Sequence, residues 1–376
     1  MVNVFEAKTK KQMRIFAQFP LKLYQGNPYY VPSFIRDDVN MKNPQKNFSA
    51  KGCDVKCFLA QKNGKIVGRI AGIIVWESNK KYNAKCVRFS RMDFIEDEEV
   101  ARALLKAVED FGREKGMKTV HGPWGFNDTD REGLLTEGFD KISTYATNYS
   151  YPYYAEILQK LGYKFENEWV EYRFNVPTLD ERYAKLAEIV KNRYGFEDVS
   201  ERLTLKQLIN KYGDKFFKCY NASYKDVEGY VDIVGDVKKD VLKQFASIIN
   251  EKYYSVIIDK KTDEVIAFGI AMPSIAKVLQ KHKGSLVKSY FGLVKTISKP
   301  KALELCIVGV HPDYRRKGAN AMVINRIWSN VVKDGITDIV GNPMLTTNLD
   351  VLMQWKNVPH EIIKRRKTFF KSIGEK

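Results

Sequence analysis

One order of predicted elements occurs twice along the 376 residues, and this repetition restricts the possible folds more than any other feature. In the first half, a hairpin pattern over Cys57–Val75 precedes the strand pattern Cys86–Ile95. An amphipathic helix over about Glu98–Lys115 follows, Gly116 ends it, and Met117–Val120 is typical of a buried strand. A hairpin gives antiparallel strands, whereas a helix that joins two strands of one sheet gives parallel ones. The pattern therefore predicts a mixed sheet.

The same elements return in the second half in the same order. Tyr254–Met272 has a hairpin pattern, Ala302–Val310 is the next strand, a helix spans about Ala319–Val332, and Ile336–Val340 is the last strand. Hairpins and helices in some order occur in any α/β protein, but the segments GMKTVHGP and GITDIVGNP, each after its helix, are also alike. We predict two copies of one mixed α/β fold, each a twisted sheet with helices on both faces.

The boundary between the copies is predicted at Val176-Pro177-Thr178, where a proline interrupts the strand and helix patterns. A helix over about Leu179–Lys191 then opens the second half. The predicted domains are residues 1–175 and residues 176–376, and a chain of this length is long enough to fill two ordinary cores.

Composition favours a soluble protein. The longest apolar stretches, such as Cys306–Val310, are far shorter than the roughly 20 residues that a membrane span requires. The charged N-terminus lacks the apolar core of a secretory signal, so we expect a cytoplasmic protein. The net charge of +18 attracts polyanions such as nucleic acid, acidic lipid headgroups or a phosphorylated cofactor. Basic residues are dense in Lys364–Lys371 and again in Lys277–Lys301.

Cysteine and histidine usage gives no sign of a disulfide framework or a metal site. The five cysteines are an odd number without a CxxC pair, and the four histidines have no ligand spacing. We therefore expect no metal cofactor. Cys306 lies inside an apolar strand, where a small buried hydrophobic residue is expected rather than a nucleophile.

The segment 304–321 has the pattern of an anion-binding site. An apolar strand runs directly into a turn with three cations, Arg315, Arg316 and Lys317, and then into a helix that begins just after Gly318. The unpaired amides and the dipole of a helix N-terminus favour a negative charge there. Gly318 lets the backbone approach a phosphate without an intervening Cβ.

With the V-x-V-x-P sequence that leads into it, this segment resembles the central motif of the GNAT superfamily of acetyltransferases. The resemblance implies that the end of the strand presents backbone groups to the pantetheine arm of acetyl-CoA or another acyl-CoA, and that the basic turn holds its pyrophosphate. Asn320 stands where the superfamily usually has Gly or Ala. The implied cofactor contacts are Val308, Gly309, Val310, Arg315, Arg316, Lys317, Gly318, Ala319 and Asn320.

Two residues farther along correspond to functional positions in the superfamily. Asn348 matches an Asn that approaches the pantetheine arm, and it is also a good helix N-cap. Trp355 stands where many members have the tyrosine that protonates the leaving thiolate. Tryptophan has no such acidic proton, so the acid would be another group, such as Tyr290 or Tyr314, or solvent.

Glu304 is the best-placed candidate for the base that deprotonates an acceptor amine. It lies six residues before Val310 on one strand, and strand alternation predicts that it shares a face with Cys306, Val308 and Val310. Apolar neighbours would raise the pKa of Glu304. The same position is also compatible with an ordinary glutamate at the edge of a cleft. Gly309 is expected to permit a bulge that opens the strand.

The first half lacks the basic turn, because Glu96, Asp97, Glu98 and Glu99 precede its helix and would repel a pyrophosphate. This half instead has a glycine-rich and aromatic region. Its tyrosine run Tyr149–Tyr154 either forms turns and core or, together with nearby acids, a pocket for a cationic amine; the acids are Asp128, Asp130 and Asp140. The arrangement resembles uncharacterised bacterial proteins of GNAT type.

The sequence thus predicts an acyl-CoA-dependent N-acyltransferase, with acetyl-CoA favoured, that acts on a small-molecule or peptide amine. Two alternatives stay open. The departures at Asn320 and Trp355 are compatible with a non-catalytic scaffold or ligand sensor that has a vestigial coenzyme site. The basic charge is compatible with an aminoacyl-tRNA-dependent transferase, although nucleic acid is not the favoured partner.

Overall fold

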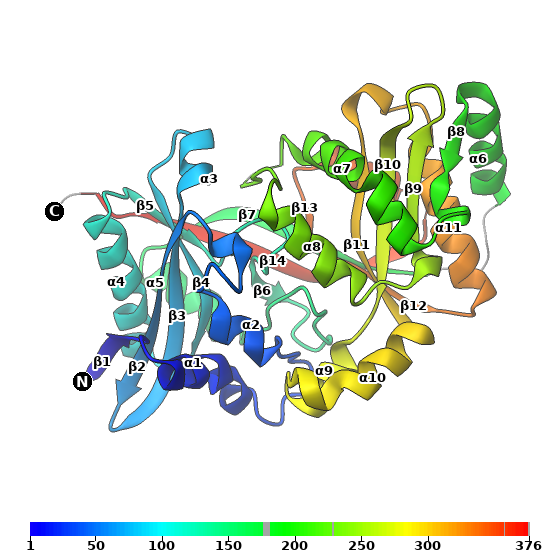
Figure 1. The fold of residues 1–376 in the computed structure, drawn as a ribbon. Helices are drawn as coiled ribbons and strands as arrows, with labels where there is room; N and C mark the ends of the chain where they lie inside the picture. Colours follow the sequence, from blue (N-terminus) through cyan, green and yellow to red (C-terminus); the bar gives the residue numbers. More distant parts are fainter. Residues whose placement is uncertain (176–180, 228, 357, 375–376) are drawn as a thin grey trace.

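The computed structural model describes residues 1–175, 181–227, 229–356 and 358–374. Their strands form one continuous mixed sheet that runs through both halves (Figure 1). From one edge to the other, the strands follow the order β1 (Val2–Glu6), β2 (Cys53–Lys62), β3 (Lys65–Val75), β4 (Cys86–Phe94), β5 (Thr119–Gly122), β14 (His360–Ser372), β7 (Lys164–Phe174), β12 (Asp338–Gly341), β11 (Ala302–Val310), β10 (Glu264–Pro273), β9 (Tyr254–Asp259) and β8 (Phe196–Asp198). Two short strands lie off this path: β13 (Met344–Leu345) pairs with β7, and β6 (Leu134–Glu137) pairs with β14.

In the first half, helices cover both faces of the sheet. The amphipathic helix α4 (Glu98–Glu114) joins the parallel strands β4 and β5, and its apolar side packs on the sheet together with α5 (Tyr153–Lys160). The opposite face is covered by α1 (Lys10–Leu23), and α2 (Ile35–Asn40) lies beside α1. A short helix, α3 (Trp76–Lys81), follows β3.

The second half repeats this arrangement. Helices α6 (Glu181–Tyr194) and α11 (Ala319–Lys333) cover one face, and α7 (Leu205–Tyr224) with α8 (Asp236–Ala246) covers the other. A helical hairpin, α9 (Ala276–His282) and α10 (Leu286–Ser298), joins β10 to β11, and α12 (Leu349–Gln354) precedes β14. Short 3₁₀ turns lie at η1 (Phe48–Ala50), η2 (Val199–Glu201), η3 (Glu251–Tyr253) and η4 (Pro312–Tyr314). The predicted mixed α/β fold with helices on both faces in each half is confirmed, but the two halves share one sheet instead of having one each.

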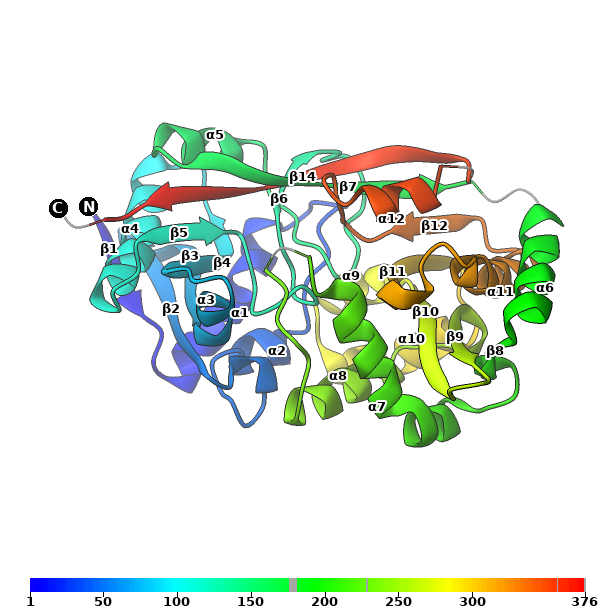
Figure 2. The same cartoon turned by 90° about the horizontal axis from the view of Figure 1, so that it is seen from above.

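The last strand does not stay in the second half. β14 pairs with β5 and β6 on one side and with β7 on the other, and Figure 2 shows it running beside β7 along the molecule. β7, which belongs to the first half, pairs in turn with β12 and β13. The predicted boundary at Val176-Pro177-Thr178 lies outside the described residues and stays a prediction. The sheet thus joins the two halves through interleaved strands.

A buried charge cluster lies where β7 and β14 meet. The side chains of Glu171, Lys364 and Arg366 are 0% exposed, and Glu171 accepts hydrogen bonds from both cations. Burial opposes ionisation of the carboxyl group, but Arg366 and Lys364 together hold the pKa of Glu171 below its ordinary value. The basic run noted in the sequence therefore lies partly inside the molecule.

Candidate active site

The candidate site begins where two parallel strands separate. β11 pairs with β12 only from Ala302 opposite Asp338 to Leu305 opposite Gly341. The Asn342 amide then donates to the Leu305 carbonyl at 2.9 Å, after which the chain turns into β13 against β7. β11 runs on to Val310 with β10 on its other side. The edge of β11 that faced β12 is thus open, and an extended ligand with amide groups can pair with such an edge.

A β-bulge at Cys306 corrects the predicted alternation. Leu305 lies opposite Ala271 and Ile307 opposite Ile270, so Cys306 is the extra residue on β11. A bulge changes which face the following side chains occupy. Cys306 and Ile307 pack with the core under α7, whereas Val308 and Val310 pack with the core under α11.

The prediction that Glu304 shares a face with Val308 and Val310 is therefore wrong, because the bulge lies between them. Its β10 neighbour, Met272, belongs to the core under α7. The bulge also lies three residues earlier than the predicted one at Gly309. Gly309 has a different reason for lacking a side chain, since a Cβ there would lie 2.5 Å from the ring of Phe268.

Glu304 is a buried carboxyl group at the contact between the two halves, with a side chain 2% exposed. Ser274, just after β10, donates to its Oε1 at 2.7 Å, and the backbone amide of Tyr145 from the first half also donates to its carboxylate. Burial raises the pKa of Glu304 to about 7, although these hydrogen bonds and the nearby charge of Lys364 oppose the rise. A carboxyl group that titrates near neutral pH is suited to accept and release a proton.

The basic turn leads directly into the N-terminus of α11. Arg316 and Gly318 both have the left-handed conformation, with φ of 62° and 82°, and such turns direct successive N–H groups to one side. Arg315 and Arg316 are exposed, whereas Asn320 is half-buried in the first turn of the helix. Gly318 is also required for packing, because a Cβ there would lie 2.5 Å from Cγ2 of Val190 on α6.

The turn lies beside α12. Arg315 approaches Asp350 in the first turn of α12, with 3.7 Å between Nη1 and Oδ2. Asn348 caps this helix, because its Oδ1 accepts from the Val351 amide at 3.3 Å. Trp355 is a core residue, 6% exposed and in ring contact with Phe174. The structure therefore brings Arg315 near the helix that Asn348 opens, and it directs Trp355 into the core.

The structure reveals Tyr224, at the end of α7, as a further candidate residue. Its hydroxyl donates to the carbonyl of Val308 on the open part of β11 at 3.2 Å, and its ring stacks on Tyr220 at 4.5 Å. Burial and then the negative charge of Asp128 raise the pKa of Tyr224, so its hydroxyl keeps its proton. The earlier candidates lie elsewhere: Tyr314 donates to Asp259, and Tyr290 is 60% exposed on α10. The signal in the sequence for this pair is its spacing of four residues, which puts Tyr220 and Tyr224 on one face of a helix.

An apolar pocket lies between α7, α8 and the sheet, on the face to which Ile307 points. Its cavity volume is about 50 Å³, and the wall that it exposes is apolar. Tyr220 and Thr129 also line it, and Thr129 comes from the first half. Tyr220 donates to Asp128 of the same loop at 3.0 Å. The first half thus contributes one wall to a pocket of the second half.

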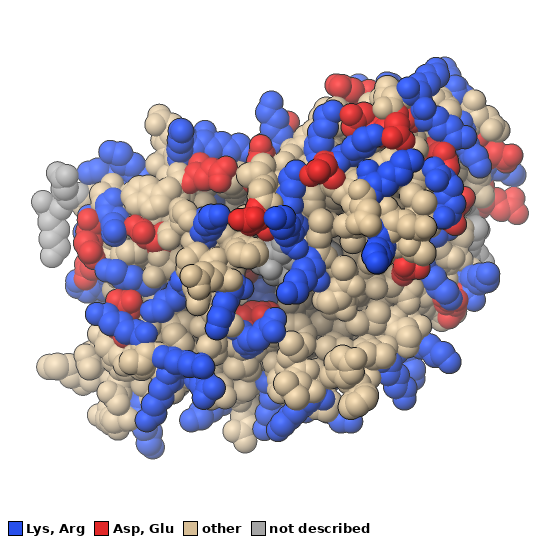
Figure 3. All heavy atoms as spheres, in the orientation of Figure 1, with Lys and Arg blue, Asp and Glu red and all other residues tan. Residues whose placement is uncertain are grey.

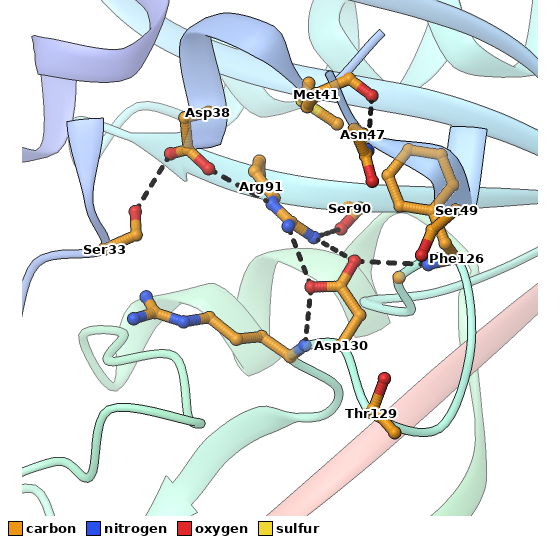
Figure 4. A network of polar contacts seen from close by, with 12 residues as sticks. Ser33, Asp38, Met41, Asn47, Ser49, Ser90, Arg91, Phe126, Thr129 and Asp130 are labelled. Carbon is orange, nitrogen blue, oxygen red and sulfur yellow. Dashed lines mark hydrogen bonds and ion pairs between the residues drawn. The ribbon is translucent and has the colours of Figure 1, made fainter. Parts of the chain in front are cut away.

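Figure 4 shows how this loop of the first half is fixed. Arg91 donates from both terminal nitrogens to Asp130 at 2.8 Å, and Asp130 accepts in addition from the Phe126 amide at 3.2 Å. Asp38 lies on the other side of Arg91, 3.5 Å from its Nε. The loop that carries Asp128 is therefore held by a bidentate ion pair.

These contacts argue against Asp128, Asp130 and Asp140 as the acids of an amine pocket in the first half. Arg91 neutralises Asp130, and Lys141 pairs with Asp140 at the surface. Asp128 accepts a hydrogen bond from Tyr220 and is thereby directed to the second half. Within the tyrosine run, Tyr154 is buried in the core, where its hydroxyl lies 3.0 Å from that of Tyr24. Tyr151 and Tyr153 instead line an open pocket together with Glu96 and Glu156. The acids therefore have separate partners.

The N-terminus of α4 in the first half is already satisfied. Asp97 caps the helix by accepting from the Glu99 amide at 2.9 Å, and Lys62 pairs with both carboxylates at 2.7 and 2.8 Å. These side chains occupy the position that a phosphate takes at a helix N-terminus.

In the described ranges, no group of three or more His, Cys, Asp or Glu side chains is arranged to hold a metal ion. Burial raises the pKa of the Cys306 thiol well above its ordinary value, which disfavours a thiolate nucleophile. None of the helices that the structure describes is long and apolar enough to cross a membrane.

The chain was compared with protein families, curated proteins and solved structures. No family model matches the chain. Protein YghO of Escherichia coli (strain K12) is 24% identical over 318 residues, which cover 81% of this chain and 78% of YghO. A bacterial ceramide synthase of Caulobacter vibrioides (strain NA1000 / CB15N) is 21% identical over 315 residues, which cover 80% of this chain and 77% of that protein.

Among solved structures, a tandem GNAT protein from the clavulanic acid biosynthesis pathway superimposes over 100% of both chains, with a TM-score of 0.59 and 9% sequence identity. The identity is low, but the match includes both halves of the sheet in one alignment. The separated strands β11 and β12 and the turn before α11 lie within the part that superimposes. The chain therefore has the tandem GNAT fold.

Proposed function

We propose that this protein transfers an acyl group from an acyl-coenzyme A, with acetyl-CoA as the favoured donor, to an amine. The observation that carries the proposal is the continuity between the open edge of β11 and the basic turn before α11. An extended pantetheine arm could pair with Val308–Val310 while the diphosphate rests on the amides that follow Arg315. The coenzyme, when bound, supplies the acyl group as a reactive thioester.

The residues of the turn fit an anionic cofactor. Gly318 starts the helix without a side chain of its own, and the first amides of α11 precede its intrahelical hydrogen bonds. Arg315 and Arg316 are exposed at the same turn, and the nearby Asp350 is 83% exposed and free to move aside. Asn348 would act by holding α12 beside this site, since its side chain caps the helix.

Two side chains would move protons. Glu304 would accept a proton from the ammonium group of the acceptor, which frees the nitrogen lone pair for attack on the thioester carbon. Tyr224, which stays protonated, would donate a proton to the sulfur as the C–S bond breaks, and the thiol leaves. The nitrogen loses its second proton as the amide forms, and this proton would restore the Tyr224 hydroxyl. Both groups lie on or against β11, one before and one after the bulge at Cys306.

The name of one relative supports the reaction class. The Caulobacter protein is named a ceramide synthase, and a ceramide is the amide of a fatty acid with a long-chain amine. The apolar pocket under α7, which Ile307 and Tyr220 line, would suit an aliphatic part of such an acceptor or of the acyl chain. The acceptor would then approach from the face that carries Glu304.

Binding is tested on the full chain by titration calorimetry with acetyl-CoA. We expect Arg315→Glu to weaken binding about tenfold or more, because a charge-assisted contact is replaced by repulsion. Arg102→Glu, an exposed arginine on α4, is the matched control and should leave the affinity unchanged. Failure of the full chain to bind any acyl-CoA, or an equal loss in the control, would overturn the proposal.

Catalysis is tested by the release of free thiol from acetyl-CoA when amines are added. Alkylamines, polyamines and amino sugars form a first panel, with a long-chain acyl-CoA as a second donor. Amine-dependent release that Glu304→Gln abolishes is the expected result. Tight coenzyme binding without release for any amine would favour the non-catalytic alternative instead.

A further inference from the structure

The helix α10 presents a stripe of large apolar side chains to solvent. Val287, Tyr290, Phe291 and Val294 are 86%, 60%, 83% and 53% exposed. Their spacing of three, four and seven residues puts them on one side of the helix. Single exposed apolar residues are ordinary on a protein surface. Four large apolar side chains on one helix face form a patch of the kind that marks an interaction site.

The stripe belongs to a helix that is firmly held on its other side. Ser289 and Leu293 of α10 are buried, and Asn250 donates to the carbonyl of Ile297 at 2.7 Å. The turn before α10 is also fixed, because the Ile35 amide donates to the carbonyl of Gly284 at 3.1 Å. The apolar stripe is therefore the outer face of a docked helix and not a core face that has lost its support.

The charged side chains of the α9–α10 segment itself have one sign. The sequence contains no Asp or Glu between Glu264 and Glu304. Figure 3 shows lysine and uncharged side chains over α9 and α10, at the lower edge of that view. The basic residues of this interval are seven lysines: Lys277, Lys281, Lys283, Lys288, Lys295, Lys299 and Lys301. A docked amphipathic helix with an aromatic and aliphatic outer stripe and a lysine border has the properties of a membrane-surface helix.

We propose that the α9–α10 hairpin docks the protein on the surface of an anionic lipid bilayer. The stripe enters the boundary between headgroups and acyl chains, and the lysines contact the headgroup phosphates. A second copy of the chain fits this surface poorly, since a twofold contact through α10 would bring two lysine borders together. Nucleic acid would satisfy the lysines but not the exposed Val287 and Phe291.

The α9–α10 hairpin begins next to the candidate active site. The hairpin begins two residues after Ser274, which donates to Glu304. A protein bound through α10 would thus hold this side of its second half near the bilayer. The proposal does not depend on acyl transfer, because lipid binding by α10 requires neither coenzyme nor amine.

The test is co-sedimentation of the full chain with large vesicles of phosphatidylcholine, with or without phosphatidylglycerol. We expect binding to the anionic vesicles that weakens as salt is raised. The double variant Val287→Ser with Phe291→Ser should bind about tenfold more weakly, because it removes two inserted side chains. Lys288→Gln with Lys295→Gln should reduce binding to anionic vesicles and flatten its salt dependence.

The control is Leu349→Ser with Met353→Ser, an exposed apolar pair on α12 that is 67% and 59% exposed. This variant should bind vesicles as the unmodified chain does. All four altered apolar positions are exposed, so thermal unfolding should be unchanged and confirm that each variant folds. Absence of binding to anionic vesicles, or an equal loss in the α12 control, would refute the proposal. A concentration-dependent dimer that the α10 pair alone abolishes, seen by light scattering, would also refute it in favour of a second copy.

Discussion

Ser274 donates a hydrogen bond of 2.7 Å to Glu304, a carboxyl group whose pKa burial raises to about 7. A base acts only in its ionised form, so acyl transfer at limiting substrate should rise with pH through about 7 and then level off. Ser274→Ala removes a hydrogen bond that lowers the pKa of Glu304, so the rise should move to higher pH. The measurement is kcat/KM against pH for both proteins. Identical profiles would remove Ser274 from the mechanism.

Replacing the base itself should separate chemistry from binding. Glu304→Gln keeps the shape of the side chain and should lower the rate of acyl transfer about 10²- to 10⁴-fold, the usual contribution of general base catalysis. Affinity for acetyl-CoA, measured by calorimetry, should stay within about twofold, because Glu304 lies before the open edge of β11. A variant that loses coenzyme affinity as well would indicate a structural role.

Tyr224 and Tyr220 stack on each other but donate to different groups, which makes them a matched pair. Tyr224→Phe removes the donor at the Val308 carbonyl and should lower kcat about tenfold or more. Tyr220→Phe removes the donor to Asp128 and should leave kcat within about twofold. Both rings remain, so unfolding by urea should show similar stability for the two variants. Equal kcat values would exclude Tyr224 as the proton donor.

Gly318 combines a positive φ of 82° with close contact to Val190. Gly318→Ala should destabilise the fold by about 1–3 kcal/mol, through backbone strain and a clash. Gly335→Ala is the control for strain alone, because Gly335 has a φ of 66° and open space around it. Gly318→Ala should therefore cost more than Gly335→Ala, and Val190→Ala should recover part of the difference. Urea unfolding at a fixed temperature measures all of these free energies.

The carboxylate of Glu171 is enclosed with Lys364 and Arg366. Glu171→Gln leaves two cations without their counter-charge and should lower the free energy of unfolding by about 3–5 kcal/mol. Glu168→Gln, at a partly exposed carboxylate that pairs with Arg365, should cost less than about 1 kcal/mol.

The same cluster should make stability depend on pH. The pKa of Glu171 is lower in the folded than in the unfolded chain, so its contribution is full above the unfolded value of about 4.3 and is lost as pH falls through the folded value. Urea unfolding from neutral to acid pH should show this loss in the unmodified chain and a weaker pH dependence in Glu171→Gln. An equal dependence in both would assign acid unfolding to other carboxylates.

Local patterns were sufficient to predict most of the elements. The apolar run Ala302–Val310 is the observed β11, and α11 begins at the predicted Ala319. The amphipathic pattern predicted over Glu98–Lys115 likewise corresponds to the observed α4, whose apolar side is buried. These signals depend on residues that are neighbours in the chain, so one sequence contains them in full.

Contacts between distant residues could not be predicted in the same way. The bulge at Cys306 depends on the register between β10 and β11, and it puts Val308 and Val310 on the face opposite to that of Glu304. Asp130 seemed available to an amine until the structure placed Arg91 beside it, 39 residues away in sequence. Tyr224 meets Val308 across 84 residues of sequence. In each case the local sequence was compatible with several roles for the residue, and a tertiary contact determined which one it has.

The position of β14 has a consequence for how the protein is made. The first half emerges from the ribosome early, yet β5 and β7 lack the strand that lies between them until His360–Ser372 has been synthesised. The facing edges of β5 and β7 therefore stay unpaired while the second half is translated. Unpaired strand edges can associate with other chains. The sheet of the first half is therefore completed only by a strand that is translated after the second half.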